Sequence, residues 1–241
     1  MKCRFCFLLL VGFLALYCVS VALSQQDASL VGYWAFEEGK GDTVKDQSAK
    51  ANDGKIKGDV NWVNGNIGKA LEFKSGSYVE IPDSESLKDM KAYTVALWVK
   101  MNKLSADWNH ILEKDGSYAI TINSGGGDFR FTPNSSKVWA PSNYKVKEDT
   151  WYYVTLVGDA SAIQFYVNAK KEADLKETLA FNTNTVTIGH GPSYPVDGTV
   201  DEVKMWAIAL KDTEIAVAMK GNAAVDPSVK ATTTWASIKD Q

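Results

Sequence analysis

The feature that most constrains the fold is a series of about twelve short segments in which apolar and polar residues alternate, with turn residues about every 8–12 positions. Side chains of a β-strand point to opposite faces with a period of two residues, so each segment is predicted to be a strand. Helical character is confined to Lys211–Lys220, which ends at Gly221. No internal repeat or proline-rich linker divides the chain. The sequence therefore predicts one all-β domain, a two-sheet antiparallel sandwich with one short C-terminal helix.

Four segments are expected to organise the sheets. Tyr93–Met101 is apolar on both faces and is predicted to be a central strand. Asp115-Gly116 predicts a hairpin between residues 110–114 and 118–122, and Ser75-Gly76 predicts another between residues 69–73 and 77–81. Residues 151–157 and 163–168 are expected to form a third hairpin.

The last strand, residues 198–210, contains one residue that does not fit its pattern. Strict alternation places Asp201 on the same side as the core-facing Val203 and Met205. A carboxylate buried there needs hydrogen bonds or a cation, because burying an uncompensated charge is costly. Asp201 is therefore predicted either to accept backbone amides at a bulge or to bind a metal ion.

Several segments resemble laminin-G-like, concanavalin A-type jelly-roll modules. Gly198–Leu210 with the following helix resembles the last strand of these modules, and Leu30–Gly39 resembles the first. Further similar segments are the Asp46, Ser48, Asn52, Asp53, Gly54 loop, the run from Gly68 to Pro82, and the pair at residues 151–168. The resemblance covers about residues 28–221 and implies a jelly roll in which the first and last strands pair.

The N-terminus has the pattern of an export signal. Lys2 and Arg4 precede the apolar run Phe5–Leu23, and small residues before the boundary predict cleavage after Ser24. An uncleaved membrane anchor is the alternative, since the run is close to the ~20 residues that a membrane helix needs. The expected organisation is a signal peptide at 1–24, the domain at 28–221, and a polar tail at 222–241 that packs on the domain edge.

Cleavage would change the composition of the chain. All three cysteines lie in the signal, so the mature chain would contain no disulfide. It would carry 24 basic and 29 acidic residues, a net charge of −5, and Arg130 as its one arginine. This acidic balance argues against nucleic acid and, after signal cleavage, against a membrane as partner. A secreted, cell-surface or periplasmic location is expected.

Catalytic patterns are weak. The nearest match to the Glu-x-Asp-x-Glu strand of related glucanases is Glu80–Glu85, and Pro82 should interrupt that strand. The two histidines, His110 and His190, are judged too few for a zinc cluster. The absence of these patterns makes an enzyme less expected than a binding protein.

Calcium is the expected cofactor. The resemblance implies a structural Ca²⁺ between the first and last strands, which maps onto Asp201 with Glu37 and Gly39. Carboxylate and backbone oxygens are the ligands that Ca²⁺ prefers. A second candidate is the loop containing Asp46, Asn52 and Asp53, whose side chains are alternatively explained as turn formers.

Sugar binding needs exposed aromatic rings beside polar groups, because a sugar ring stacks on an aromatic face while its hydroxyls form hydrogen bonds. The candidate residues lie in loops between the predicted strands. They are Trp108, Trp139, Tyr144, Tyr194, Asp128 and His190, with Asn134 and Asn143 nearby.

The predicted function is a non-catalytic binding module that recognises a glycan or a cell-surface or extracellular protein through its loops. Two alternatives stay open. One is a polysaccharide hydrolase or lyase with an unrecognised site, and the other is a purely structural surface domain.

Overall fold

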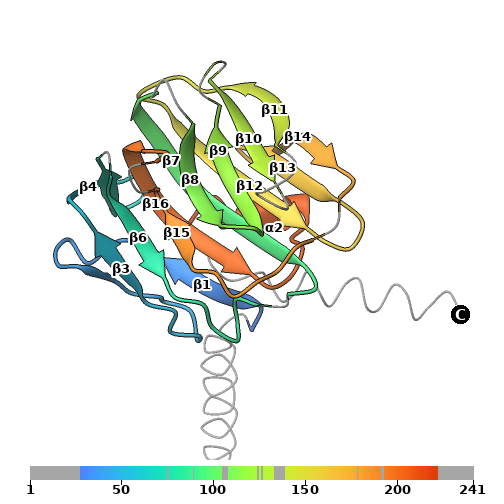
Figure 1. Cartoon of the computed structure of the whole chain (residues 1–241), viewed down its shortest axis with the longest axis horizontal. Helices are drawn as coiled ribbons and strands as arrows, with labels where there is room; N and C mark the ends of the chain where they lie inside the picture. Colours follow the sequence, from blue (N-terminus) through green and yellow to red (C-terminus); the bar gives the residue numbers. More distant parts are fainter. Residues whose placement is uncertain are drawn as a thin grey trace, which may run out of the picture.

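A computed structural model describes residues 28–221, except residues 75, 89, 105–107, 124, 126, 133–138, 178 and 191–192, and the side chain of Asn143. The described residues form two antiparallel sheets stacked face to face (Figure 1). This arrangement confirms the predicted jelly-roll sandwich. The predicted signal and tail, residues 1–24 and 222–241, lie outside the described residues.

Sheet A contains eight strands. Across the sheet they are β14 (Lys170–Leu175), β13 (Ile163–Val167), β12 (Trp151–Gly158), β7 (Tyr93–Lys103), β16 (Asp197–Trp206), β5 (Lys69–Phe73) and β4 (Val60–Asn64), and β1 (Leu30–Trp34) pairs with β16. As predicted, β7 is central, lying between β12 and β16.

Sheet B also contains eight strands. In order they are β11 (Ala140–Lys145), β10 (Asp128–Thr132), β9 (Tyr118–Ile122), β8 (Asn109–Lys114), β15 (Val186–Ile188), β6 (Tyr78–Ile81), β3 (Gly54–Lys57) and β2 (Thr43–Val44). The main core lies between the sheets, where Phe131 of β10 stacks on Phe165 of β13 with ring centroids 5.3 Å apart.

The first and last strands pair, as the resemblance implied. Strand β1 runs antiparallel to β16, with Trp34 opposite Val203. Glu202 has a left-handed φ of 54°, and the register of β16 shifts between Asp201 and Lys204. This bulge reverses the alternation, so Val200, Val203 and Met205 all join the core. The prediction that Asp201 shares a side with Val203 and Met205 is therefore wrong.

One predicted hairpin is also wrong. Strand β5 belongs to sheet A and β6 to sheet B, so the turn near Gly76 carries the chain from one sheet to the other. The alternation of apolar and polar residues cannot distinguish a hairpin from such a crossing. In either case the two strands that flank the turn each present one apolar face to the same core. The hairpins β8–β9 and β12–β13 are confirmed.

Helix α2 (Asp212–Ala218) covers the outer face of sheet A, where Ile215 packs in a second apolar cluster with Tyr153 and Trp206. Gly221 follows with a φ of 87°, consistent with its predicted role as a helix stop. None of the helices in the described part of the chain has the length and apolarity needed to cross a membrane.

Candidate functional site

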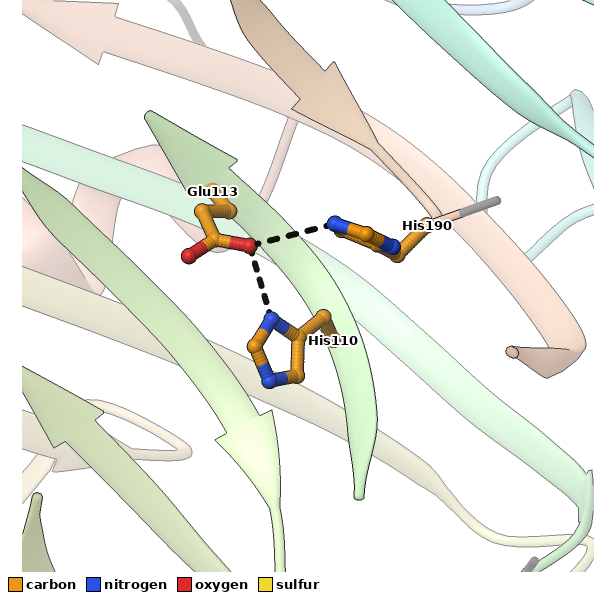
Figure 2. Close-up of side chains that lie close together, drawn as sticks. All are labelled: His110, Glu113 and His190. Carbon is orange, nitrogen blue, oxygen red and sulfur yellow. Dashed lines mark hydrogen bonds and ion pairs between the residues drawn. The ribbon is translucent and has the colours of Figure 1, made fainter. Parts of the chain in front are cut away.

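The candidate site is built on the outward face of β8, turned away from the core. Strand β8 has a bulge between His110 and Leu112, and both Ile111 and Leu112 are fully buried in the core. The extra residue places His110 and Glu113 on the same outward face, although they are three positions apart. Nδ1 of His110 lies 2.7 Å from Oε2 of Glu113 (Figure 2).

The loop after β15 brings His190 to the same carboxylate. Gly189 has a φ of 69°, a conformation that favours glycine, and its N–H donates to the Ile111 carbonyl at 2.7 Å. Two further hydrogen bonds join this loop to β8, from the His110 N–H to the Tyr194 carbonyl at 3.3 Å and from the Asn109 amide to the Pro195 carbonyl at 2.7 Å. Nε2 of His190 consequently lies 3.5 Å from Oε2 of Glu113 (Figure 2).

Three aromatic side chains surround this cluster. Tyr194 stacks on His110, with ring centroids 4.3 Å apart and an interplanar angle of 10°. Trp139 lies 5.4 Å from the His110 ring and 5.3 Å from Trp108. Tyr194 remains 39% exposed, so part of this aromatic surface faces solvent.

The cluster lies where two hollows meet. The aromatic hollow has a volume of about 230 Å³ and is lined by Trp108, His110, Glu113, Asp115, Trp139 and Tyr194. The polar hollow has a volume of about 370 Å³ and is lined by Glu113, Asp115, Thr183, Asn184, Thr185, Thr187 and His190. Because Glu113 and Asp115 line both, the two hollows adjoin.

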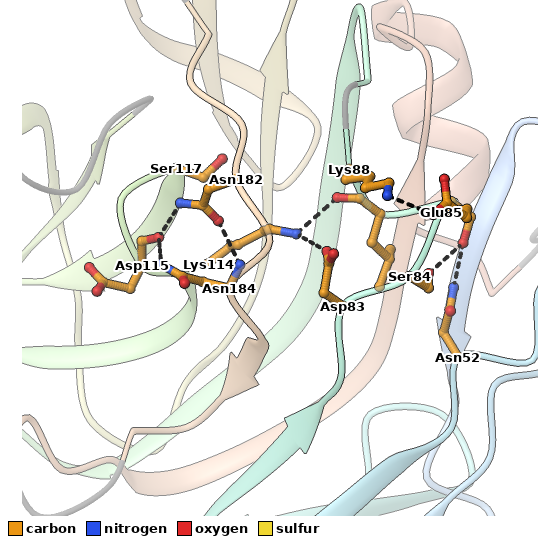
Figure 3. Close-up of polar contacts among 12 residues, drawn as sticks. Asn52, Asp83, Ser84, Glu85, Lys88, Lys114, Asp115, Ser117, Asn182 and Asn184 are labelled. Carbon is orange, nitrogen blue, oxygen red and sulfur yellow. Dashed lines mark hydrogen bonds and ion pairs between the residues drawn. The ribbon is translucent and has the colours of Figure 1, made fainter.

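The rim of the polar hollow is held by amide side chains. Asn182 and Asn184 both donate to the Asp115 carbonyl, at 2.6 and 2.9 Å (Figure 3). Ser117 donates to the Ala180 carbonyl. These contacts fix the segment before β15 to the β8–β9 turn and so define the width of the hollow.

Four of the six residues predicted to bind sugar gather here: Trp108, Trp139, Tyr194 and His190. Tyr144 does not line these hollows, since it packs on the main core against Phe129 and Tyr152. Asp128 is also absent from their lining and is 4% exposed, with ion pairs to Arg130 and Lys145. The nearby Asn134 and the side chain of Asn143 lie outside the described part.

The sequence interpretation missed His110, Glu113, Asp115 and the threonines before and within β15. Simple alternation puts His110 and Glu113 on opposite faces, and the bulge at Ile111 reverses this. The expectation that two histidines are too few for a metal cluster also needs correction. His110, His190 and Glu113 have donor atoms within 4.8 Å of one another.

Asp201 lies on the other sheet, and its two carboxylate oxygens differ in their hydrogen bonds. Oδ2 accepts the N–H of Ile67 in the β4–β5 turn at 2.9 Å, while buried Oδ1 has no hydrogen-bond partner among the described residues. Burial raises the pKa of this carboxyl group to about 7, and the nearby charge of Glu202 acts in the same direction, while the backbone N–H groups of Ile67, Asn66 and Glu202 oppose the shift. Such an arrangement suits a cation, which would satisfy the orphaned oxygen.

Glu37 reaches the same turn. Its Oε1 accepts the N–H of Lys69 at 3.0 Å. A Cβ at Gly68 would collide with this carboxylate, and one at Gly65 would collide with that of Asp201. Both carboxylates therefore fit closely against a turn that glycine keeps open, and the residues present are compatible with a calcium ion.

The second calcium candidate is satisfied internally. Oδ1 of Asp46 accepts the N–H groups of Tyr33 and Ser48, and its Oδ2 accepts from the Ser48 hydroxyl and the Asn52 N–H, all within 2.8 Å. Asp53 accepts the Asp46 N–H at 3.0 Å. These bonds favour the turn-forming explanation for this loop.

The fold and site together define a class: two-sheet jelly rolls that carry an aromatic-lined site on the outward face of one sheet. A family model described as the concanavalin A-like lectin/glucanases superfamily matches residues 73–216, more than half of the 241-residue chain. The chain therefore belongs to this superfamily. Among curated proteins, no sequence matches it.

Solved structures share the fold at low sequence identity. Domain 4 of AbnA, a GH43 extracellular arabinanase from Geobacillus stearothermophilus, solved with arabinotriose, is 20% identical with a TM-score of 0.66, covering 79% of this chain and 98% of that one. A structure of botulinum neurotoxin type C, whose cell entry is described as dependent on interaction with two ganglioside molecules, is 15% identical with a TM-score of 0.66. The match covers 83% of this chain and 52% of that one. The binding domain of botulinum neurotoxin DC with rat synaptotagmin II is 16% identical with a TM-score of 0.65, covering 80% and 51%. The chain thus spans about half of the toxin structures.

Proposed function

We propose that this protein is a non-catalytic binding module that recognises a carbohydrate through the aromatic hollow. The observation that carries the proposal is the convergence of Trp108, Trp139 and Tyr194 around the polar pair of His110 and Glu113. Aromatic faces supply stacking surface for a sugar ring, and the pair supplies hydrogen-bonding groups at its edge.

The polar hollow suits the next sugar unit of an oligosaccharide. It presents hydroxyl and amide side chains, which match the alternating donors and acceptors of sugar hydroxyls. Specificity for one glycan would then come from this hollow, and stacking in the aromatic hollow would supply most of the affinity.

Two of the compared structures are named with sugars, arabinotriose and gangliosides, and one is named with a protein receptor, synaptotagmin II. This range supports a glycan as first candidate and an extracellular or cell-surface protein as the second. Another hollow, about 470 Å³ on sheet A beside Tyr166 and Asp212, has Tyr166 as its one aromatic residue and suits stacking less well.

We further propose that the protein is exported and carries one structural Ca²⁺. Support for export comes from Lys2 and Arg4 before the apolar run of residues 5–23. Support for calcium comes from the orphaned Oδ1 of Asp201 and from Glu37 at the same turn. Such an ion would tie the last strand to the β4–β5 turn and leave the sugar-binding hollow untouched.

The test is a glycan array probed with the protein, once with Ca²⁺ and once with chelator. We expect binding to a group of related glycans, retained in chelator because the proposed calcium ion lies on the other sheet. A blank array would contradict carbohydrate recognition and redirect the search to protein partners at the cell surface.

Hydrolysis of the bound glycan is the alternative to non-catalytic binding, because Glu113 and Asp115 line both hollows and glycoside hydrolysis uses paired carboxyl groups. Glycans that bind the array are incubated with the protein, and the products are separated by chromatography. Cleavage that disappears in Glu113→Gln would replace the binding proposal with an enzymatic one.

A further inference from the structure

We propose that His110, Glu113 and His190 form a binding site for Zn²⁺ or a similar divalent transition metal at the floor of the aromatic hollow. Two imidazoles and one carboxylate are a donor set that zinc sites use when they keep one position open. This site is separate from the proposed calcium ion at Asp201, which has oxygen ligands on the other sheet.

The distances between the donor atoms fit a metal of this size. Zinc bonds of about 2.0–2.2 Å place neighbouring tetrahedral ligands about 3.3 Å apart. Oε2 of Glu113 lies 2.7 Å from His110 Nδ1 and 3.5 Å from His190 Nε2, and all three donors lie within 4.8 Å of one another. Small side-chain rotations would therefore bring the three atoms to metal-binding distance, with Nδ1 of His110 and Nε2 of His190 as the donor nitrogens.

The surroundings hold the ligands in place and leave a route for the ion. The side chains of His110 and Glu113 are 6% and 7% exposed, and stacking with Tyr194 restricts the His110 ring. The side chain of His190 is 29% exposed and lies beside the polar hollow. A metal could enter from that hollow and meet two ligands that are already positioned, which reduces the entropic cost of binding.

The open position of the ion would face the hollows that Glu113 lines. The array in chelator, which also removes Zn²⁺, measures glycan binding by the hollows without the metal, and an added effect of Zn²⁺ on that binding is an extension that rests on the proposed sugar binding. The metal site itself does not depend on it, since Zn²⁺ binding and glycan binding are measured separately.

Imidazole NMR during a Zn²⁺ titration tests the proposal. The chain contains only two histidines, so the spectrum of the protein, purified without a histidine tag, has two imidazole spin systems. We expect one equivalent of Zn²⁺ to shift the resonances of both rings together, while Ca²⁺ leaves them unchanged. This readout also separates the site from the three thiols at Cys3, Cys6 and Cys18.

Variants then assign the ligands. His190→Ala and Glu113→Gln should each weaken Zn²⁺ binding at least tenfold, measured by the imidazole shifts that remain. Glu80→Gln is the matched control, because Glu80 is a half-exposed carboxylate of sheet B that pairs with Lys57 and lies outside the cluster. Rings that do not respond to Zn²⁺, or an affinity that His190→Ala leaves unchanged, would overturn the proposal whatever the glycan array shows.

Discussion

Nδ1 of His110 lies 2.7 Å from Oε2 of Glu113 because an extra residue in β8 places two side chains of opposite parity on one face. This relationship creates the floor of the aromatic hollow, and the loop that carries His190 and Tyr194 closes over it. We propose that sugar binds in this hollow, so changes to its aromatic rings should change the affinity for glycan.

Removing either indole of the aromatic hollow should weaken glycan binding. Trp108→Ala and Trp139→Ala each remove stacking surface, and we expect at least a tenfold loss of affinity, which corresponds to about 1.4 kcal/mol. Isothermal titration with the best glycan from the array measures the change. Trp151→Ala is the control, because Trp151 is half-buried on sheet A beneath Lys100. Equal losses in all three variants would show that the hollow is not the binding site.

Calcium should stabilise the folded protein through Asp201. An ion that binds only the folded state raises the melting temperature by mass action. Millimolar Ca²⁺ should therefore raise the melting temperature of the wild type and leave that of Asp201→Asn unchanged. Wild-type melting curves that coincide in Ca²⁺ and in chelator would remove the calcium proposal.

In chelator, stability should fall as the pH rises from about 4 to 7. The pKa of Asp201 is raised to about 7 in the folded protein from an ordinary value of 3.8. The unfolded chain therefore binds fewer protons than the folded one in this pH range. Each pH unit should lower the free energy of unfolding by up to about 1.4 kcal/mol.

Urea unfolding at several pH values measures this slope. Carboxylates with lowered pKa values, such as Asp53 and Asp159, act in the opposite direction at lower pH, so the comparison is with Asp201→Asn. The variant should lose the decrease between pH 4 and 7. A slope that is the same in both proteins would show that Asp201 does not hold a proton when folded.

A buried ion pair should contribute strongly to the pairing of the first and last strands. Nζ of Lys204 lies 2.6 Å from Glu202, which also accepts the hydroxyl of Tyr33 from β1 at 2.9 Å. Lys204→Met leaves a buried carboxylate without its cation, and we expect a loss of about 3–5 kcal/mol in the free energy of unfolding.

Urea unfolding checks this value against a surface pair. Lys45→Met breaks the exposed pair with Asp53 and should change the free energy of unfolding far less than Lys204→Met, because water already screens this pair. Adding Glu202→Gln to Lys204→Met should restore part of the loss, since no charge is then left buried. Similar losses in Lys204→Met and Lys45→Met would contradict the proposed role of the pair.

Sequence periodicity predicted the architecture because the apolar faces of strands such as β7 and β12 can be recognised from each segment alone, without knowledge of its distant contacts. It failed at the bulges of Ile111 and Glu202, since one extra residue reverses every side chain that follows. The aromatic loop residues were found by residue type alone. These residues converge with His110, whereas Tyr144 and Asp128 lie apart from them. Both outcomes depend on tertiary contacts that no local pattern encodes.

The most direct test of sugar binding is the NMR spectrum of the indole N–H groups during titration with the best glycan from the array. We predict that, among the eight tryptophans, the signals of Trp108 and Trp139 shift most, with saturation at one glycan per protein. Shifts confined to other tryptophans, such as Trp62 or Trp151 on sheet A, would contradict the assignment of the aromatic hollow as the sugar-binding site.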